Sequence, residues 1–98
     1  MKTTIFSLLL LAGLIFAGCA PKHPKIGLLI HSYDAPRWQN DQRYFVDAVK
    51  QLDGTVQVKV ADNNAQKQLV QAKELISKGA MVLVVIPVDQ GTAAQIIN

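Results

Sequence analysis

The sequence is poor in the residues that build most metal and redox sites. Its 98 residues include one cysteine, Cys19, and two histidines, His23 and His31. A single cysteine excludes an intramolecular disulfide and every zinc site that needs several cysteines. The two histidines lack the spacing of zinc ligands, so we expect no metal site.

The chain also lacks the motifs of nucleotide-binding and hydrolytic enzymes. Neither G-x-G-x-x-G nor G-x-x-x-x-G-K-S/T occurs, which excludes the familiar phosphate-binding loops. Ser32 has no G-x-S-x-G context. The basic residues behind the net charge of +3 are scattered, so nucleic acid is not an expected partner. We therefore expect a protein with no cofactor and no enzymatic activity.

An apolar run near the start of the chain is too short for a convincing membrane-spanning helix. IFSLLLLAGLIF, at residues 5–16, follows Lys2 as in a secretory signal peptide. The letters FAGC at its end resemble the bacterial lipobox, although leucine is usual where phenylalanine stands. We interpret residues 1–18 as a lipoprotein signal peptide and Cys19 as the lipidated first residue of the mature chain. The alternative is an ordinary secretory signal with a chance cysteine.

Beyond a proline-containing tether at residues 19–24, strand-like and helix-like segments alternate. IGLLIH at 26–31 and MVLVVI at 81–86 are apolar runs, typical of strands buried on both faces. TVQVKVA at 55–61 alternates apolar and polar residues, which favours a strand near an edge of the sheet. Apolar residues at helical spacing predict helices at residues 37–52, at 65–78 and from Thr92 onward.

The order β-α-β-α-β-α predicts an α/β fold with a parallel sheet and right-handed crossovers. Two helices should each pack an apolar face on the sheet, formed by Phe45, Val46, Val49 and Leu52 in the first and by Leu69, Ala72, Leu75 and Ile76 in the second. The third helix has only about two turns before the sequence stops. We interpret residues 25–98 as the front part of a larger protein, and a complete three-stranded unit is the alternative.

Open parallel sheets bind ligands beyond the carboxyl ends of their strands. Here the loops at that place are residues 31–37, 61–65 and 87–91. If the strand order is 2-1-3, the first and third loops face each other across a cleft. Arg37, Trp38 and Asp89 would then converge.

These three side chains suit a neutral ligand with many hydroxyl groups. Tryptophan covers the apolar face of a sugar ring, aspartate accepts from adjacent hydroxyls and arginine donates to them. Such charge-assisted hydrogen bonds are worth about 1.5–3 kcal/mol each. Simpler roles stay open, with Trp38 in the core, Arg37 and Asp41 as an exposed helix pair, and Asp34 and Asp89 as helix caps.

Three stretches resemble the periplasmic sugar-binding proteins of bacterial ABC transporters, and in particular the xylose-binding type. They are KIGLLI, RWQND and DNNAQKQLVQAKELISKGAMVLVVIPVD. The resemblance runs from Lys25 to Asn98. It implies a fold of two α/β lobes that close on one sugar, of which this chain would supply the first half of the N-terminal lobe.

Matching positions carry the family's sugar contacts over to three residues. The start of the first helix faces the sugar in the family, which implies this role for Arg37 and Trp38, and RW resembles the xylose type. The polar residue after I-P-x accepts from sugar hydroxyls, which implies this role for Asp89. Aspartate there resembles the ribose type, whereas the xylose type has asparagine, so the resemblance leaves the sugar open.

The resemblance implies a lipoprotein that captures a monosaccharide, such as a xylose-like pentose, and delivers it to an ABC transporter permease. Its place would be extracytoplasmic, on a lipid anchor in a bacterial membrane. A domain that reports sugar to a chemoreceptor or a sensor kinase is the alternative. A repressor with the same fold would need an N-terminal DNA-binding domain, where this chain has its signal peptide.

Overall fold

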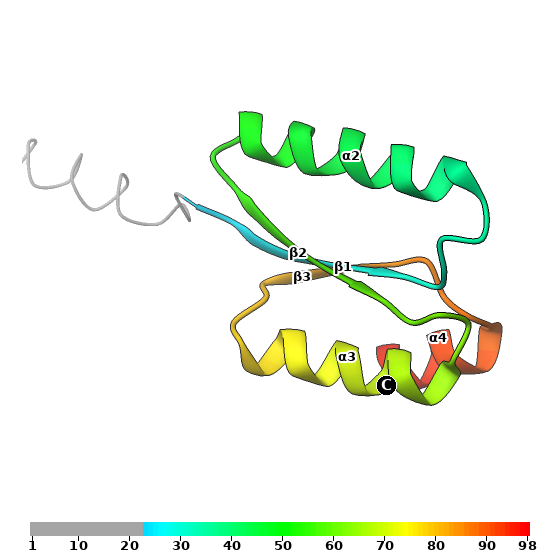
Figure 1. Cartoon of the computed structure of the whole chain (residues 1–98). Helices are drawn as coiled ribbons and strands as arrows, with labels where there is room; N and C mark the ends of the chain where they lie inside the picture. Colours follow the sequence, from blue (N-terminus) through cyan, green and yellow to red (C-terminus); the bar gives the residue numbers. More distant parts are fainter. Residues whose placement is uncertain (1–22) are drawn as a thin grey trace, which may run out of the picture.

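Three parallel strands form the centre of the fold in the order β2-β1-β3 (Figure 1). They are β1 (Lys25–Ile30), β2 (Thr55–Val60) and β3 (Val82–Val85). The structure is a computed structural model and describes residues 23–98. The predicted α/β class, the parallel sheet and the edge position of the second strand are confirmed, and the strand order is the 2-1-3 order that the cleft required. The third strand was expected to be buried on both faces, which is wrong, because it lies at the other edge and Met81 and Val82 are exposed. The predicted signal peptide and Cys19 lie outside the described residues.

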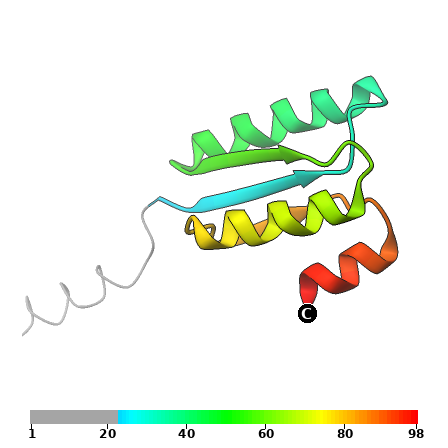
Figure 2. The same cartoon turned by 60° about the horizontal axis from the view of Figure 1, so that its bottom comes forward.

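The helices cover both faces of this sheet. They are α2 (Pro36–Gln51), α3 (Ala65–Ser77) and α4 (Gln90–Ile97). Helix α2 lies on one face, whereas α3 and α4 lie together on the other, as Figures 1 and 2 show. In the described part of the chain, no helix has both the length and the apolar character needed to cross a bilayer.

Strand β1 is the most deeply buried element because it has a neighbour on each side and helices on both faces. Leu28, Leu29 and Ile30 are at most 3% exposed. On the α3 side, Leu29 packs with Ala72 and Leu75. Partly buried residues extend this core, namely Ala80, Leu83, Val85 and Ile96. The continuous apolar character of the first strand is thus explained by burial on both of its faces.

Turn residues mark both ends of α3. The Asn64 side chain caps α3 by accepting from the Lys67 amide at 2.9 Å. Gly79 follows the C-cap residue Lys78 and has a φ of +96°, a left-handed conformation that favours glycine.

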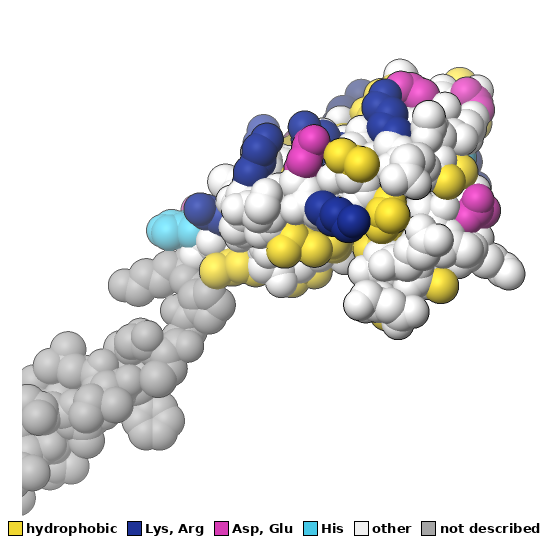
Figure 3. Space-filling model, turned by 90° about the horizontal axis from the view of Figure 1, so that it is seen from below, with side chains coloured by type: hydrophobic (Ala, Val, Ile, Leu, Met, Phe, Trp, Pro, Cys, Tyr) yellow, Lys and Arg dark blue, Asp and Glu magenta, His cyan; other side chains and the backbone are white. Residues whose placement is uncertain are grey.

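Two predicted core positions are wrong. Leu52 is 75% exposed because α2 ends at Gln51, so the next residue no longer follows the helical period. Ile76 is 56% exposed, since α3 turns Gln68, Gln71, Ala72 and Leu75 toward the sheet and Ile76 lies one step further round. Figure 3 shows the molecule from the side of α3 and α4, where lysines and exposed apolar side chains are interspersed.

Candidate functional site

The loops after the three strands leave the same side of the sheet, which we call the carboxyl edge (Figure 1). Backbone hydrogen bonds tie these loops together. The Asn63 amide donates to the His31 carbonyl at 2.8 Å, and the Ile86 amide donates to the Leu29 carbonyl at 2.8 Å. The carboxyl edge is therefore a connected frame on which side chains from distant sequence positions are held.

Trp38 lies in the first turn of α2 and is half-buried. The His31 ring, from the end of β1, meets the Trp38 ring at a centroid distance of 4.9 Å and an interplanar angle of 88°. The Arg37 guanidinium carbon lies 4.6 Å from the Trp38 ring centroid. Trp38 is thus held by two neighbours at the edge of the fold, not enclosed in the core.

His31 is a residue that the sequence analysis missed as a partner of Trp38. Its Nδ1 atom is buried and has no hydrogen-bond partner within residues 23–98. Its backbone carbonyl accepts from Asn63, so the β2–α3 loop fixes its position. The only signal in the sequence was its place directly after a buried strand.

Arg37 is exposed and forms an ion pair with Asp41 one helical turn later. The Arg37 Nη2 to Asp41 Oδ2 distance is 3.7 Å, and the two side chains are 70% and 51% exposed. An exposed pair of this kind is worth about 0.3–0.5 kcal/mol. The structure therefore contains the Arg37–Asp41 ion pair that the spacing allowed. This weak pair holds the exposed guanidinium only loosely.

Asp34 does not cap α2. The N-cap residue is Ala35, which makes no side-chain capping bond. Asp34 Oδ2 instead accepts from Asn63 Nδ2 at 2.6 Å. The cap that was left open for Asp34 is therefore excluded, because this carboxylate joins the β1–α2 loop to the β2–α3 loop.

Asp89 caps α4, as one of the two interpretations of its position predicted. Its Oδ1 atom accepts from the Thr92 amide and from the Thr92 hydroxyl, both at 2.7 Å. These hydrogen bonds from Thr92 stabilise the charged form and lower the pKa of the Asp89 carboxyl below its ordinary value. Both bonds go to Oδ1, so the cap uses one of the two carboxylate oxygens.

The buried side-chain amide of Gln68 makes hydrogen bonds to the β3–α4 loop that carries Asp89. Gln68 is 0% exposed, donates from Nε2 to the Ile86 carbonyl at 3.1 Å and accepts the Val88 amide on Oε1 at 2.9 Å. The sequence analysis did not single out Gln68, because nothing in a helical period marks a glutamine as a loop partner.

The structure brings Arg37 and Trp38 into contact, whereas Asp89 lies on a different loop, at the start of α4. All three lie at the carboxyl edge, yet α2 and α4 start on opposite faces of the sheet (Figures 1 and 2). No hydrogen bond or ion pair of the described chain joins Asp89 to Arg37 or Trp38. The convergence of all three side chains on one ligand therefore stays a prediction.

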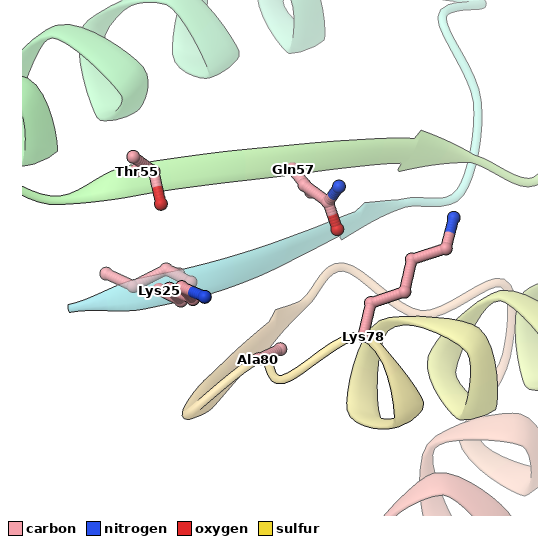
Figure 4. Close-up of a pocket in the computed structure, with 6 residues that line it drawn as sticks. Lys25, Thr55, Gln57, Lys78 and Ala80 are labelled. Atoms are coloured by element: carbon pink, nitrogen blue, oxygen red, sulfur yellow. The ribbon is translucent and has the colours of Figure 1, made fainter.

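A separate cavity lies at the amino ends of the strands, opposite the carboxyl edge (Figure 4). It is lined by Lys25, Ile26, Thr55, Gln57, Lys78 and Ala80. Open parallel sheets bind ligands at their carboxyl ends, so this cavity is the weaker candidate. Within residues 23–98, acidic, histidine and cysteine side chains form no group of three that would hold a metal ion.

The chain is similar to part of known periplasmic binding proteins. No protein-family profile matches the sequence. The D-xylose-binding periplasmic proteins of Escherichia coli strain K12 and of Haemophilus influenzae are each 32% identical to it over 77 residues. The matched region covers 79% of this chain, which spans only 23% of each relative.

Solved structures agree in fold. A solute-binding protein of an ABC transporter from Mycobacterium smegmatis, with bound glycerol, superposes with a TM-score of 0.73 at 21% identity, over 76% of this chain and 26% of its own. A carbohydrate-transporter solute-binding protein from Chloroflexus aurantiacus, in complex with D-glucose, superposes with a TM-score of 0.68 at 28% identity. The match covers 78% of this chain and 22% of that protein. By sequence the chain is thus similar to part of D-xylose-binding periplasmic proteins, and by fold it is similar to part of the solute-binding proteins of ABC transporters.

Proposed function

We propose that the chain is part of the sugar-capturing component of an ABC transporter, which binds a xylose-like pentose and delivers it to a permease. The observation that carries this proposal is the 32% identity to D-xylose-binding periplasmic proteins over 77 residues. Those relatives are named for binding and not for catalysis. Transport is favoured over sensing because the solved neighbours are named as transporter components.

In this proposal the start of α2 forms one wall of the sugar site. Trp38 would cover the apolar face of the sugar ring, and Arg37 would donate to hydroxyl groups. Arg37 now lies over the indole, so a stacked sugar would have to displace it. Displacement costs little, since exposed cation–π contacts are worth about 0.5–1 kcal/mol and the pair with Asp41 is weaker still.

Asp89 would supply the second polar contact of the site. Its Oδ1 atom already holds Thr92, so Oδ2 is the oxygen that would accept from a sugar hydroxyl. A carboxylate whose pKa is lowered stays ionised at neutral pH, and an ionised acceptor makes the stronger hydrogen bond. Cap and ligand contact are therefore compatible in one side chain.

The experiment that tests the proposed function is a titration of the isotope-labelled full chain with D-xylose and D-glucose, followed by NMR. We expect sugar-dependent shifts at the Trp38 indole N–H, at Arg37 and at Asp89. Gln57, in the cavity of Figure 4, is the internal control and should not shift. Shifts confined to that cavity, or no shift at about 100 mM sugar, where even very weak sites fill, would refute the proposal.

We also propose that residues 1–18 are a lipoprotein signal peptide, that Cys19 carries the lipid anchor and that residues 19–24 form the tether to the sugar-binding lobe. The protein would then lie outside the cytoplasm, in keeping with the periplasmic names of its relatives. In cells fed a labelled fatty acid, the wild-type chain should take up label and Cys19→Ser should not. Equal labelling of both chains would contradict the anchor.

A further inference from the structure

Helix α3 carries two buried glutamines that face the ends of strands. Gln68 and Gln71 are 0% and 8% exposed. Gln71 Nε2 donates to the Val60 carbonyl at 2.9 Å, at the end of β2, while its Oε1 has no partner within residues 23–98. Gln68 differs, because both ends of its amide bind the β3–α4 loop.

The β3–α4 loop offers few other backbone bonds. Strand β3 ends at Val85, and the Ile86 amide makes the last bond to β1. Pro87 has no amide hydrogen to donate. The Ile86 carbonyl and the Val88 amide, on either side of this proline, both pair with Gln68, and Asp89 follows directly.

We propose that Gln68 is a positioning residue that fixes the β3–α4 loop so that Asp89 is presented at the carboxyl edge. The inference rests on the proposed function in taking Asp89 as the sugar contact. The Gln68 amide both donates to and accepts from the loop, whereas a carboxylate cannot donate and an apolar side chain does neither. Replacement of Gln68 by an apolar residue would leave two partly buried backbone groups, the Ile86 carbonyl and the Val88 amide, without this partner.

The test compares Gln68→Met with Gln71→Met in the full chain. Methionine has a similar length and no amide, so each variant loses its side-chain hydrogen bonds with little change in volume. We expect the Val88 amide to exchange its hydrogen with solvent at least about tenfold faster in Gln68→Met. In Gln71→Met, the Val88 amide should keep the wild-type rate, although the fold itself loses a hydrogen bond.

Sugar titration of the same variants separates positioning from mere stability. In Gln68→Met, the shift of Asp89 on adding D-xylose should vanish while that of Trp38 remains, because α2 and His31 hold Trp38 independently. An unchanged Val88 rate in Gln68→Met, equal acceleration in both variants, or joint loss of both sugar shifts would overturn the inference. If the wild-type chain shows no sugar shift, the proposed function fails, and the Val88 exchange alone decides whether Gln68 fixes the loop.

Discussion

At the scale of single residues, Asp89 combines a structural and a proposed binding role in one carboxylate. The Thr92 amide and hydroxyl lower its pKa below the ordinary value of 3.8. A group whose pKa is lowered by folding stabilises the fold above its ordinary pKa, and this contribution is lost as the pH falls through the folded-state value. The side chain is exposed, so the effect on stability will be modest.

The corresponding prediction concerns acid. The wild-type chain should lose stability below about pH 4 in part because Asp89 takes up a proton and its bonds to Thr92 weaken. Asparagine also caps helices, so Asp89→Asn should match the wild type near neutral pH and show a shallower loss in acid. Thermal melts of both chains across this range, with the Asp89 carboxyl followed by NMR, measure the difference. Parallel pH profiles would show that Asp89 does not contribute.

Residues of the site differ in how far the sequence reveals them. Asp89 was predictable as a cap because its partner Thr92 lies three positions away. Gln68 was not, since its partners Ile86 and Val88 lie 18 and 20 positions away and are backbone groups that any residue provides. The contact between the His31 and Trp38 rings depends on the path of the β1–α2 loop, and hydrophobic periodicity does not predict the path of a loop.

At the scale of elements, α3 approaches the sheet closely at Gly27 in β1. A Cβ atom there would lie 2.8 Å from Leu75 Cδ1 and 2.8 Å from Leu83 Cδ2. Leu75 is fully buried, so its side chain has little room to yield. This contact explains why a glycine interrupts an apolar strand, where it would otherwise weaken the sheet.

Gly27→Ala should therefore destabilise the fold by about 1–3 kcal/mol through overpacking. Gly91→Ala is the matched control, because the nearest atom to a Cβ there is Asp89 Oδ1 at 3.5 Å. It lies in α4, where alanine is the better helix former, so it should be neutral or stabilising. Urea unfolding of the two variants gives both changes, and equal midpoints would show that α3 adjusts to the added methyl group.

The sequence predicted the bounds of the helices and strands more accurately than it predicted which of their residues are buried. Apolar runs and helical spacing set the strands and helices to within one or two residues, since backbone pattern is a local property. The errors at Leu52 and Ile76 arose where a helix ended early or rotated slightly. Which side of a helix meets the sheet depends on contacts that only the assembled fold supplies.

At the scale of the whole molecule, the candidate site is an open edge and not a closed pocket. The starts of α2 and α4 flank the sheet on opposite faces, and both Arg37 and Asp89 are exposed (Figure 2). The chain spans 23% of the length of its D-xylose-binding relatives. A sugar at this edge would keep much of its hydration, which limits the gain from each hydrogen bond.

The 98-residue chain by itself should therefore bind pentoses weakly, with a Kd of about 1 mM or above. The binding free energy would then be no more favourable than about −4 kcal/mol. A few charge-assisted bonds at about 1.5–3 kcal/mol each must offset the lost freedom of the sugar and of the Arg37 side chain. Calorimetry with D-xylose, D-ribose and D-glucose measures the affinity. Because Trp38 is the sole tryptophan, its fluorescence provides an independent reading of the same equilibrium. Micromolar binding by this chain would mean that the carboxyl edge encloses the sugar unaided, and Trp38→Ala and Asp89→Ala would then show which side chains achieve it.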